Sequence, residues 1–145
     1  MFVCQRCPDV QFRAIPVALY FSNMAGDFAA IFATLKPVMA EQESRFAVQK
    51  DTSKEYLLVT KAASPFPQHK GHPMWFGAVK LGKAYVSFHL MPLYMSPALE
   101  KEISPALKKR MQGKTCFNFK TIPGADLIAD LKRVTELAAR AWDRL

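Results

Sequence analysis

The chain has 145 residues, half of them hydrophobic and 12% aromatic, and this composition predicts one globular domain that buries a single core. Its 20 Lys and Arg residues against 12 Asp and Glu give a formal charge of +8, so we expect the surface to attract anions. The longest apolar run, residues 14–21, is far shorter than the roughly 18–20 residues of a membrane-spanning helix, which argues against a membrane protein.

The first 23 residues show no helix or strand period. We interpret them as an arm or a leader, and residues 24–145 as the domain itself. Asp9 precedes the apolar part of this segment and Pro16 interrupts it, which argues against a secretory signal peptide. Cys4, Cys7 and Cys116 match no disulfide framework, and this favours a reducing, cytoplasmic location.

A helix and a pair of strands open the domain. The helix is predicted from apolar residues at helical spacing, namely Phe28, Ile31, Phe32 and Leu35, and Pro37 is expected to kink or end it. Residues 45–50 and 55–61 flank a polar turn and predict two antiparallel strands. Their core-facing side chains are expected to be Phe46, Val48, Leu57 and Val59.

A second hairpin follows a proline-rich loop at residues 62–73. Residues 74–80 and 84–90 predict its strands, and the glycine in "LGK" (81–83) suits the tight turn between them. Because side chains alternate along a strand, Val86, Phe88 and Leu90 should face the core. The other face of this strand then carries Tyr85, Ser87 and His89.

The rest of the chain predicts short helices, a fifth strand and a long final helix. The segments 96–103 and 104–111 both begin with Ser-Pro, which suits a helix start. Gly113 is expected to cap the second of them, and residues 115–120 predict a strand. An apolar stripe predicts a helix from about Pro123 to the end. This order indicates an α+β two-layer sandwich, with helices on one face of a five-stranded antiparallel sheet.

The sequence resembles the YdhG-like family, bacterial domains of unknown function with a frataxin-like α+β sandwich. The resemblance spans about residues 28–137 and rests on "GHPMWFGAVKLGKAYVSFHLMPLY" and "MQGKTCFNF". The residues at family-typical positions are His89, Leu93, Tyr94, Gly113 and Lys114. The resemblance implies an iron-chaperone alternative, but frataxins are thought to use an acidic ridge. Few acids lie near the first helix here, so no metal ligands are carried over.

The outer face of the predicted sheet is the best candidate site. It should carry an aromatic wall, several hydrogen-bonding groups and a cation, which suit a small anionic or planar ligand. The proposed residues are Trp75, Tyr85, Ser87, His89, Asn118 and Lys120, with Gly77 beside Trp75 to permit close approach. A protein partner, a homodimer interface or an ordinary solvent-facing sheet are the alternatives for this face.

Other residue groups are weaker candidates. Cys4 and Cys7 form half of a zinc motif, and His69 and His72 lie in a loop without nearby partners. Cys116 with His89 is a conceivable nucleophile and base, but a lone strand cysteine is more often packed. No catalytic motif or cofactor fingerprint appears, so we predict a non-enzymatic binding or accessory domain without a cofactor. Electrostatic nucleic-acid binding ranks third, through a basic run made of Lys101, Lys108, Lys109, Arg110, Lys114 and Lys120.

Overall fold

A computed structural model describes residues 27–143 of the chain, so the predicted arm at residues 1–23 lies outside the described part. In chain order, a first helix is followed by four strands, several short helices, two further strands and a long final helix. They are α2 (Phe28–Ala40), β1 (Phe46–Asp51), β2 (Glu55–Thr60), η1 (Pro67–His69), β3 (Trp75–Leu81), β4 (Val86–Leu90), α3 (Pro92–Met95), α4 (Pro97–Glu100), α5 (Pro105–Lys108), β5 (Met111–Gln112), β6 (Cys116–Phe119) and α6 (Ala125–Trp142).

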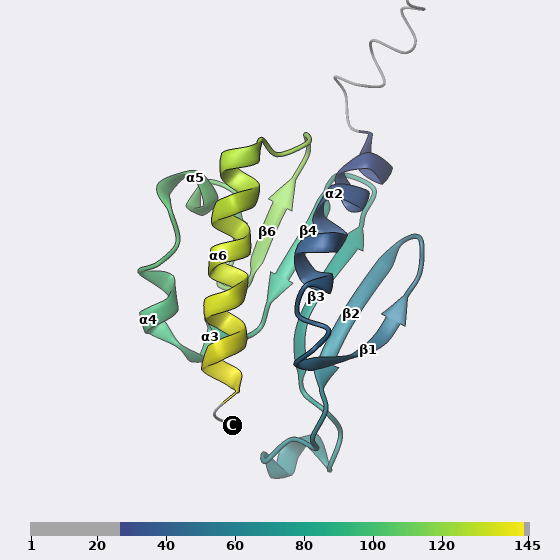
Figure 1. Cartoon of the computed structure of the whole chain (residues 1–145), viewed down its shortest axis with the longest axis vertical. Coiled ribbons are helices and arrows are strands. Elements are labelled where there is room, and N and C mark those ends of the chain that lie inside the picture. Colours follow the sequence, from purple (N-terminus) through teal and green to yellow (C-terminus); the bar gives the residue numbers. More distant parts are fainter. Residues whose placement is uncertain (1–26, 144–145) are drawn as a thin grey trace, which may run out of the picture.

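The strands form one antiparallel sheet in the order β1-β2-β3-β4-β6-β5. Helices α2 and α6 lie side by side over one face of it, and α3, α4 and α5 pack along α6 (Figure 1). The predicted α+β class is therefore confirmed. The core lies between the layers, where apolar residues of both helices meet the aromatic residues of the central strands. Its fully buried members include Ile31, Leu35, Phe76, Phe88, Phe117, Leu131 and Val134.

Pro37 does not end the first helix, and the predicted cap at Gly113 is wrong. Helix α2 continues past Pro37 to Ala40; a proline late in a helix removes one backbone donor but does not prevent the last turn from forming. Helix α5 ends at Lys108, and Gly113 is not its cap. With a φ of +75°, Gly113 instead lies in the turn that pairs β5 with β6, which adds a sixth strand to the predicted five.

The facing of β2 also differs from the prediction. Tyr56 and Leu58 belong to the main core, whereas Leu57 and Val59 cluster with Ala78 on the opposite face. The four residues from 56 to 59 are all apolar, so the sequence has no alternation that shows which of them face the helices. On the edge strand β1, Phe46 is buried as expected but Val48 is 44% exposed.

A bulge in β3 determines which face each of its residues occupies. The register with β2 shifts between Leu58, which is opposite Gly77, and Val59, which is opposite Trp75. As a result Gly77 faces α2, where an added Cβ would lie 2.6 Å from Met39 Cε. Contrary to the prediction, Gly77 therefore does not present its Cα substituent on the outer face with Trp75, although it borders a hollow of that face. The bulge inserts one residue and so reverses the alternation between them.

Candidate functional site: the outer sheet face and the adjoining groove

The outer face, turned away from α2 and α6, carries a row of polar side chains across its central strands. The register sets Ser87 beside Lys80 and Asn118, and His89 beside Ala78 and Cys116. Of the predicted site residues, Ser87, His89 and Asn118 thus lie together within the strands. Trp75 is the first residue of β3, whereas Tyr85 and Lys120 lie just outside the strands. The Tyr85 carbonyl oxygen accepts a hydrogen bond from the Gly82 N–H and so closes the turn.

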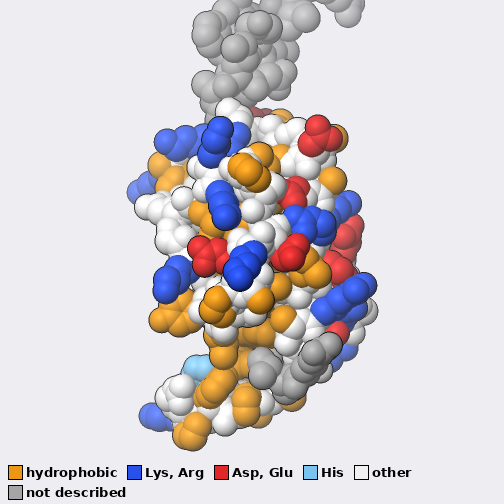
Figure 2. All heavy atoms as spheres, turned by 90° about the vertical axis from the view of Figure 1, so that its left-hand side faces the viewer, with side chains coloured by type: hydrophobic (Ala, Val, Ile, Leu, Met, Phe, Trp, Pro, Cys, Tyr) orange, Lys and Arg blue, Asp and Glu red, His pale blue; other side chains and the backbone are white. Residues whose placement is uncertain are grey.

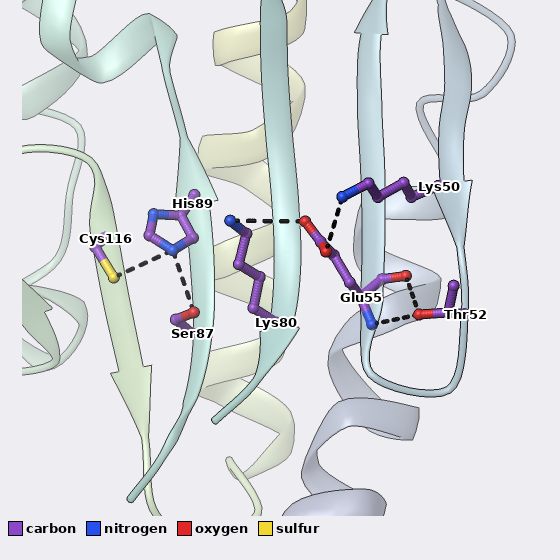
Figure 3. Close-up of polar contacts among 7 residues, drawn as sticks. All are labelled: Lys50, Thr52, Glu55, Lys80, Ser87, His89 and Cys116. Atoms are coloured by element: carbon purple, nitrogen blue, oxygen red, sulfur yellow. Dashed lines mark hydrogen bonds and ion pairs between the residues drawn. The ribbon is translucent and has the colours of Figure 1, made fainter. Parts of the chain in front are cut away.

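A chain of polar contacts links the residues of β4, β6 and β5. His89 Nε2 lies 3.1 Å from Ser87 Oγ and 3.8 Å from Cys116 Sγ (Figure 3). The Cys116 thiol donates to Asn118 Oδ1 at 3.1 Å, and the Asn118 amide donates to Gln112 at 2.5 Å. Sequence patterns singled out Ser87, His89, Cys116 and Asn118, but not Gln112, and did not show that Cys116 connects His89 to Asn118.

This cluster does not have the electrostatics of an activated cysteine. Burial, and secondarily the ammonium of Lys80, lower the pKa of His89, and burial raises the pKa of the Cys116 thiol. A reactive cysteine needs the reverse, a cationic neighbour that stabilises the thiolate. At neutral pH the pair is therefore an imidazole beside a thiol, and it serves as a hydrogen-bonding surface.

The lowered pKa of His89 predicts an acid-sensitive stability. Below the unfolded-state value of about 6.5, the unfolded chain takes up a proton that folded His89 resists, so stability is lost as pH falls. Lys80 on β3, Cys116 on β6 and Ser87 on β4 are the polar groups around the ring. Compared with His89→Gln, the native protein should lose more stability between about pH 7.5 and 5, measured by urea unfolding. Parallel losses in the two proteins would contradict this.

A charged triad occupies the neighbouring strands of the same face. Glu55 lies between two lysines, 3.4 Å from Lys50 Nζ and 3.6 Å from Lys80 Nζ, and the Lys80 side chain lies between Glu55 and His89 (Figure 3). The Lys80 ammonium also lies 5.1 Å from the centre of the Trp75 ring. One carboxylate is shared by two ammonium groups, so the triad keeps an excess positive charge.

An apolar groove of about 620 Å³ opens beside this face, next to Trp75. The loop between β2 and β3 forms one wall, helix α3 forms the other, and Trp142 at the end of α6 lines it as well. Its apolar lining is aromatic and methionine-rich, consisting of Phe66, Met74, Trp75, Met91, Tyr94, Met95 and Trp142, with His69 and His72 among the polar residues.

Exposed hydrophobic side chains are concentrated at this groove. Trp75 is 48% exposed, Met91 36%, Tyr94 65% and Met95 47%, whereas the other large exposed hydrophobics of residues 27–143 are only Val48 and Ile122. Figure 2 shows hydrophobic side chains gathered in the lower part of the molecule, between the helical body and the protruding loop. Clusters of exposed apolar side chains are typical of interaction sites, whereas scattered ones need no explanation.

Local hydrogen bonds hold the loop wall in place. Ser64 Oγ lies 2.6 Å from His69 Nδ1, and the Ser64 N–H donates to His72 O across the loop. Thr60 Oγ1 accepts from the Met74 N–H at 2.9 Å, which ties the loop to the sheet. The β2–β3 loop is thus exposed but held by its own hydrogen bonds, and His69 and His72 line the groove.

Sequence reasoning missed this groove, although one signal was present. In "MPLYM" (91–95) every position is apolar, and a short surface helix needs only one apolar face. Pro92 and Leu93 point into the protein, and Met91, Tyr94 and Met95 remain exposed around the groove. Two apolar faces on one helix indicate a second apolar contact beyond the core.

The remaining candidates find less support among the described residues. In residues 27–143 no group of three or more His, Cys, Asp or Glu side chains is placed to hold a metal ion, and Cys4 and Cys7 lie outside that range. Two members of the basic run lie over aromatic rings, Lys114 over Tyr94 and Arg110 over Phe119. No helix in the described part of the chain is long and apolar enough to span a membrane.

In comparisons with known proteins, no family model, curated protein or solved structure matches the chain.

Proposed function

We propose that this protein is a non-enzymatic binding domain that holds a planar, largely apolar small molecule in the groove between the β2–β3 loop and α3. The observation that carries this proposal is the convergence of Trp75, Met91, Tyr94 and Met95, all exposed, around a cavity of about 620 Å³. Ligand pockets typically measure about 300–1,000 Å³ and are mostly apolar with a few polar groups.

The lining suits a flat ligand better than a protein surface. Trp75 and Tyr94 line the groove with aromatic rings, against which a ring system can pack. Methionine side chains adapt to irregular shapes, and Met74, Met91 and Met95 provide such a lining. His69, His72 and Gln68 supply hydrogen-bonding groups that can orient a bound molecule.

The proposal includes the YdhG-like type of domain and a cytoplasmic location. The helix–sheet–helix order and the hairpin that carries His89 support the former, and the free thiol of Cys116 supports the latter. A frataxin-like metal chaperone remains the second hypothesis from the sequence, but no specific observation in residues 27–143 favours it. The site proposed here differs from the sequence-based one in extending from the sheet face into the groove, with Trp75 common to both.

Titration with N-phenyl-1-naphthylamine, a neutral aromatic fluorophore, tests the proposal. We expect saturable binding, and removal of both aromatic rims by Trp75→Ala with Tyr94→Ala should weaken it at least about tenfold, since central aromatic contacts carry much of a site's affinity. Both side chains are about half exposed or more, so the variant should keep the native melting temperature.

Ile122→Ser is the matched control for this titration. Ile122 is 52% exposed and precedes α6, whereas the groove lies at the opposite end of that 18-residue helix. The control should bind the fluorophore as the native protein does. Equal affinities for the native protein, the rim variant and the control would refute the groove as the binding site.

A further inference from the structure

We infer that the ligand is an amphipathic anion whose apolar body lies in the groove and whose negative group lies at Lys80 in an adjoining hollow of the outer face. This inference rests on the proposed function and specifies its ligand class. The hollow measures about 90 Å³ and is lined by Trp75, Gly77, Ala78, Lys80, His89 and Met91. Trp75 and Met91 also line the groove, so the two cavities share a wall.

The shared wall allows one molecule to reach both cavities. Trp75 has the Lys80 ammonium over its ring, 5.1 Å from the ring centre, while the same side chain lines the groove. A ligand that packs against Trp75 in the groove and extends past this side chain into the hollow therefore brings its end close to Lys80. A volume of about 90 Å³ corresponds to about three water molecules, which is enough for a carboxylate or sulfonate group.

Charge determines what that substituent should be. None of the residues that line the groove or the hollow in the described chain is acidic. Lys80 does have an acidic neighbour, Glu55, but that carboxylate also lies 3.4 Å from Lys50. Lys80 can therefore turn toward a ligand anion while Lys50 still compensates Glu55. An anion in this hollow meets a net positive field.

Lys80 is a better anchor for the anion than Lys114, the lysine that lies over the Tyr94 ring. Lys114 lies 5.6 Å from the centre of the Tyr94 ring, yet it lines neither the groove nor the hollow. Lys80 lines the hollow directly and has His89 on the same wall as a hydrogen-bonding group. The expected ligand is consequently a flat or elongated apolar molecule with one anionic end.

Two fluorophores with the same aromatic body test the inference. N-phenyl-1-naphthylamine is neutral, and 8-anilinonaphthalene-1-sulfonate adds one sulfonate to the same anilinonaphthalene frame. We expect Lys80→Met to weaken binding of the sulfonate about three- to tenfold, because one charge-assisted contact is lost. Binding of the neutral fluorophore should change by less than about twofold, since the groove is intact.

Three further variants separate a local effect from a general loss of charge. Lys83→Met removes the same charge from the exposed hairpin turn and should leave both affinities unchanged. Lys80→Arg retains the charge and should retain the preference for the sulfonate. If Lys83→Met weakens the sulfonate as much as Lys80→Met, or if Lys114→Met does so instead of Lys80→Met, the assignment of Lys80 is wrong.

The two proposals fail in different ways in this experiment. If the neutral fluorophore does not bind, or binds equally well after Trp75→Ala with Tyr94→Ala, the proposed function is overturned. In another outcome, Trp75→Ala with Tyr94→Ala weakens binding of the neutral fluorophore, but the native protein and Lys80→Met bind the sulfonate equally. This result would overturn only the anionic ligand class. Melting temperatures near the native value in all variants show that the fold is retained in each comparison.

Discussion

Phe76→Ala should lower the free energy of unfolding by about 3–5 kcal/mol, as removal of a fully buried aromatic side chain does. Phe76 has no exposed surface, stacks on Phe46 at 3.9 Å between ring centres, and meets Trp142 edge-on at 6.1 Å. These three rings join β1, β3 and α6, so the cavity left by alanine opens between elements that other contacts hold apart. We expect a fall in melting temperature of about 10 °C or more by differential scanning calorimetry.

Val48→Ala is the control for this substitution. Val48 is also an apolar strand residue, but it is 44% exposed on the edge strand β1, and its truncation should cost less than about 1 kcal/mol. Similar costs for the two substitutions would show that the ring stack does not support the core. Because Trp142 also lines the groove, Phe76→Ala should in addition weaken binding of the neutral fluorophore at temperatures where the variant is folded.

Gly77→Ala should be the second strongly destabilising change, at about 1–3 kcal/mol, although it adds only a methyl group. The new Cβ would lie 2.6 Å from Met39 Cε and 2.7 Å from the His89 carbonyl oxygen. The methionine tip can move aside, but the carbonyl belongs to β4, which pairs with β3 along its length. Relief of the second contact therefore requires separation of the two central strands, and urea unfolding should show the cost.

Gly124→Ser provides the comparison, since a Cβ at Gly124 meets nothing within 4 Å and the residue caps α6. A serine there can accept a hydrogen bond at the helix start, so the change should be neutral or slightly stabilising. A neutral result for Gly77→Ala as well would mean that β3 is free to shift at the bulge. The placement of Trp75 relative to Lys80 would then be less restricted than the proposed ligand requires.

The fold class and several elements could be predicted because they depend on local patterns. The stripes of α2 and α6 and the alternation of β4 each repeat over enough residues to show which side faces the core. Ser104 caps α5 as its sequence predicts, accepting a hydrogen bond from the Leu107 N–H. The outward facing of Ser87 and His89 follows from the same alternation.

Predictions of strand facing were wrong where the local sequence does not show which residues face the core, or where the alternation is interrupted. The all-apolar run of β2 is compatible with either facing, and only pairing with β1 and β3 decides that Tyr56 and Leu58 meet the helices. The bulge next to Gly77 is equally invisible in the sequence of β3, because it results from a mismatch of register with β2. The two residues of β5 are too few to show any alternation.

The same distinction between local pattern and tertiary packing applies to the candidate site. The side chains of β4 and β6 that share the outer face can be predicted from the sequence, since strand geometry requires that successive residues alternate. The groove that the β2–β3 loop, α3 and the end of α6 enclose next to Trp75, and the position of Lys80 over the Trp75 ring, depend on how the elements pack. The residues that line the groove lie up to 76 positions apart in the sequence, from Phe66 to Trp142. No local period relates such residues, because packing between layers brings them together only once the whole domain has folded.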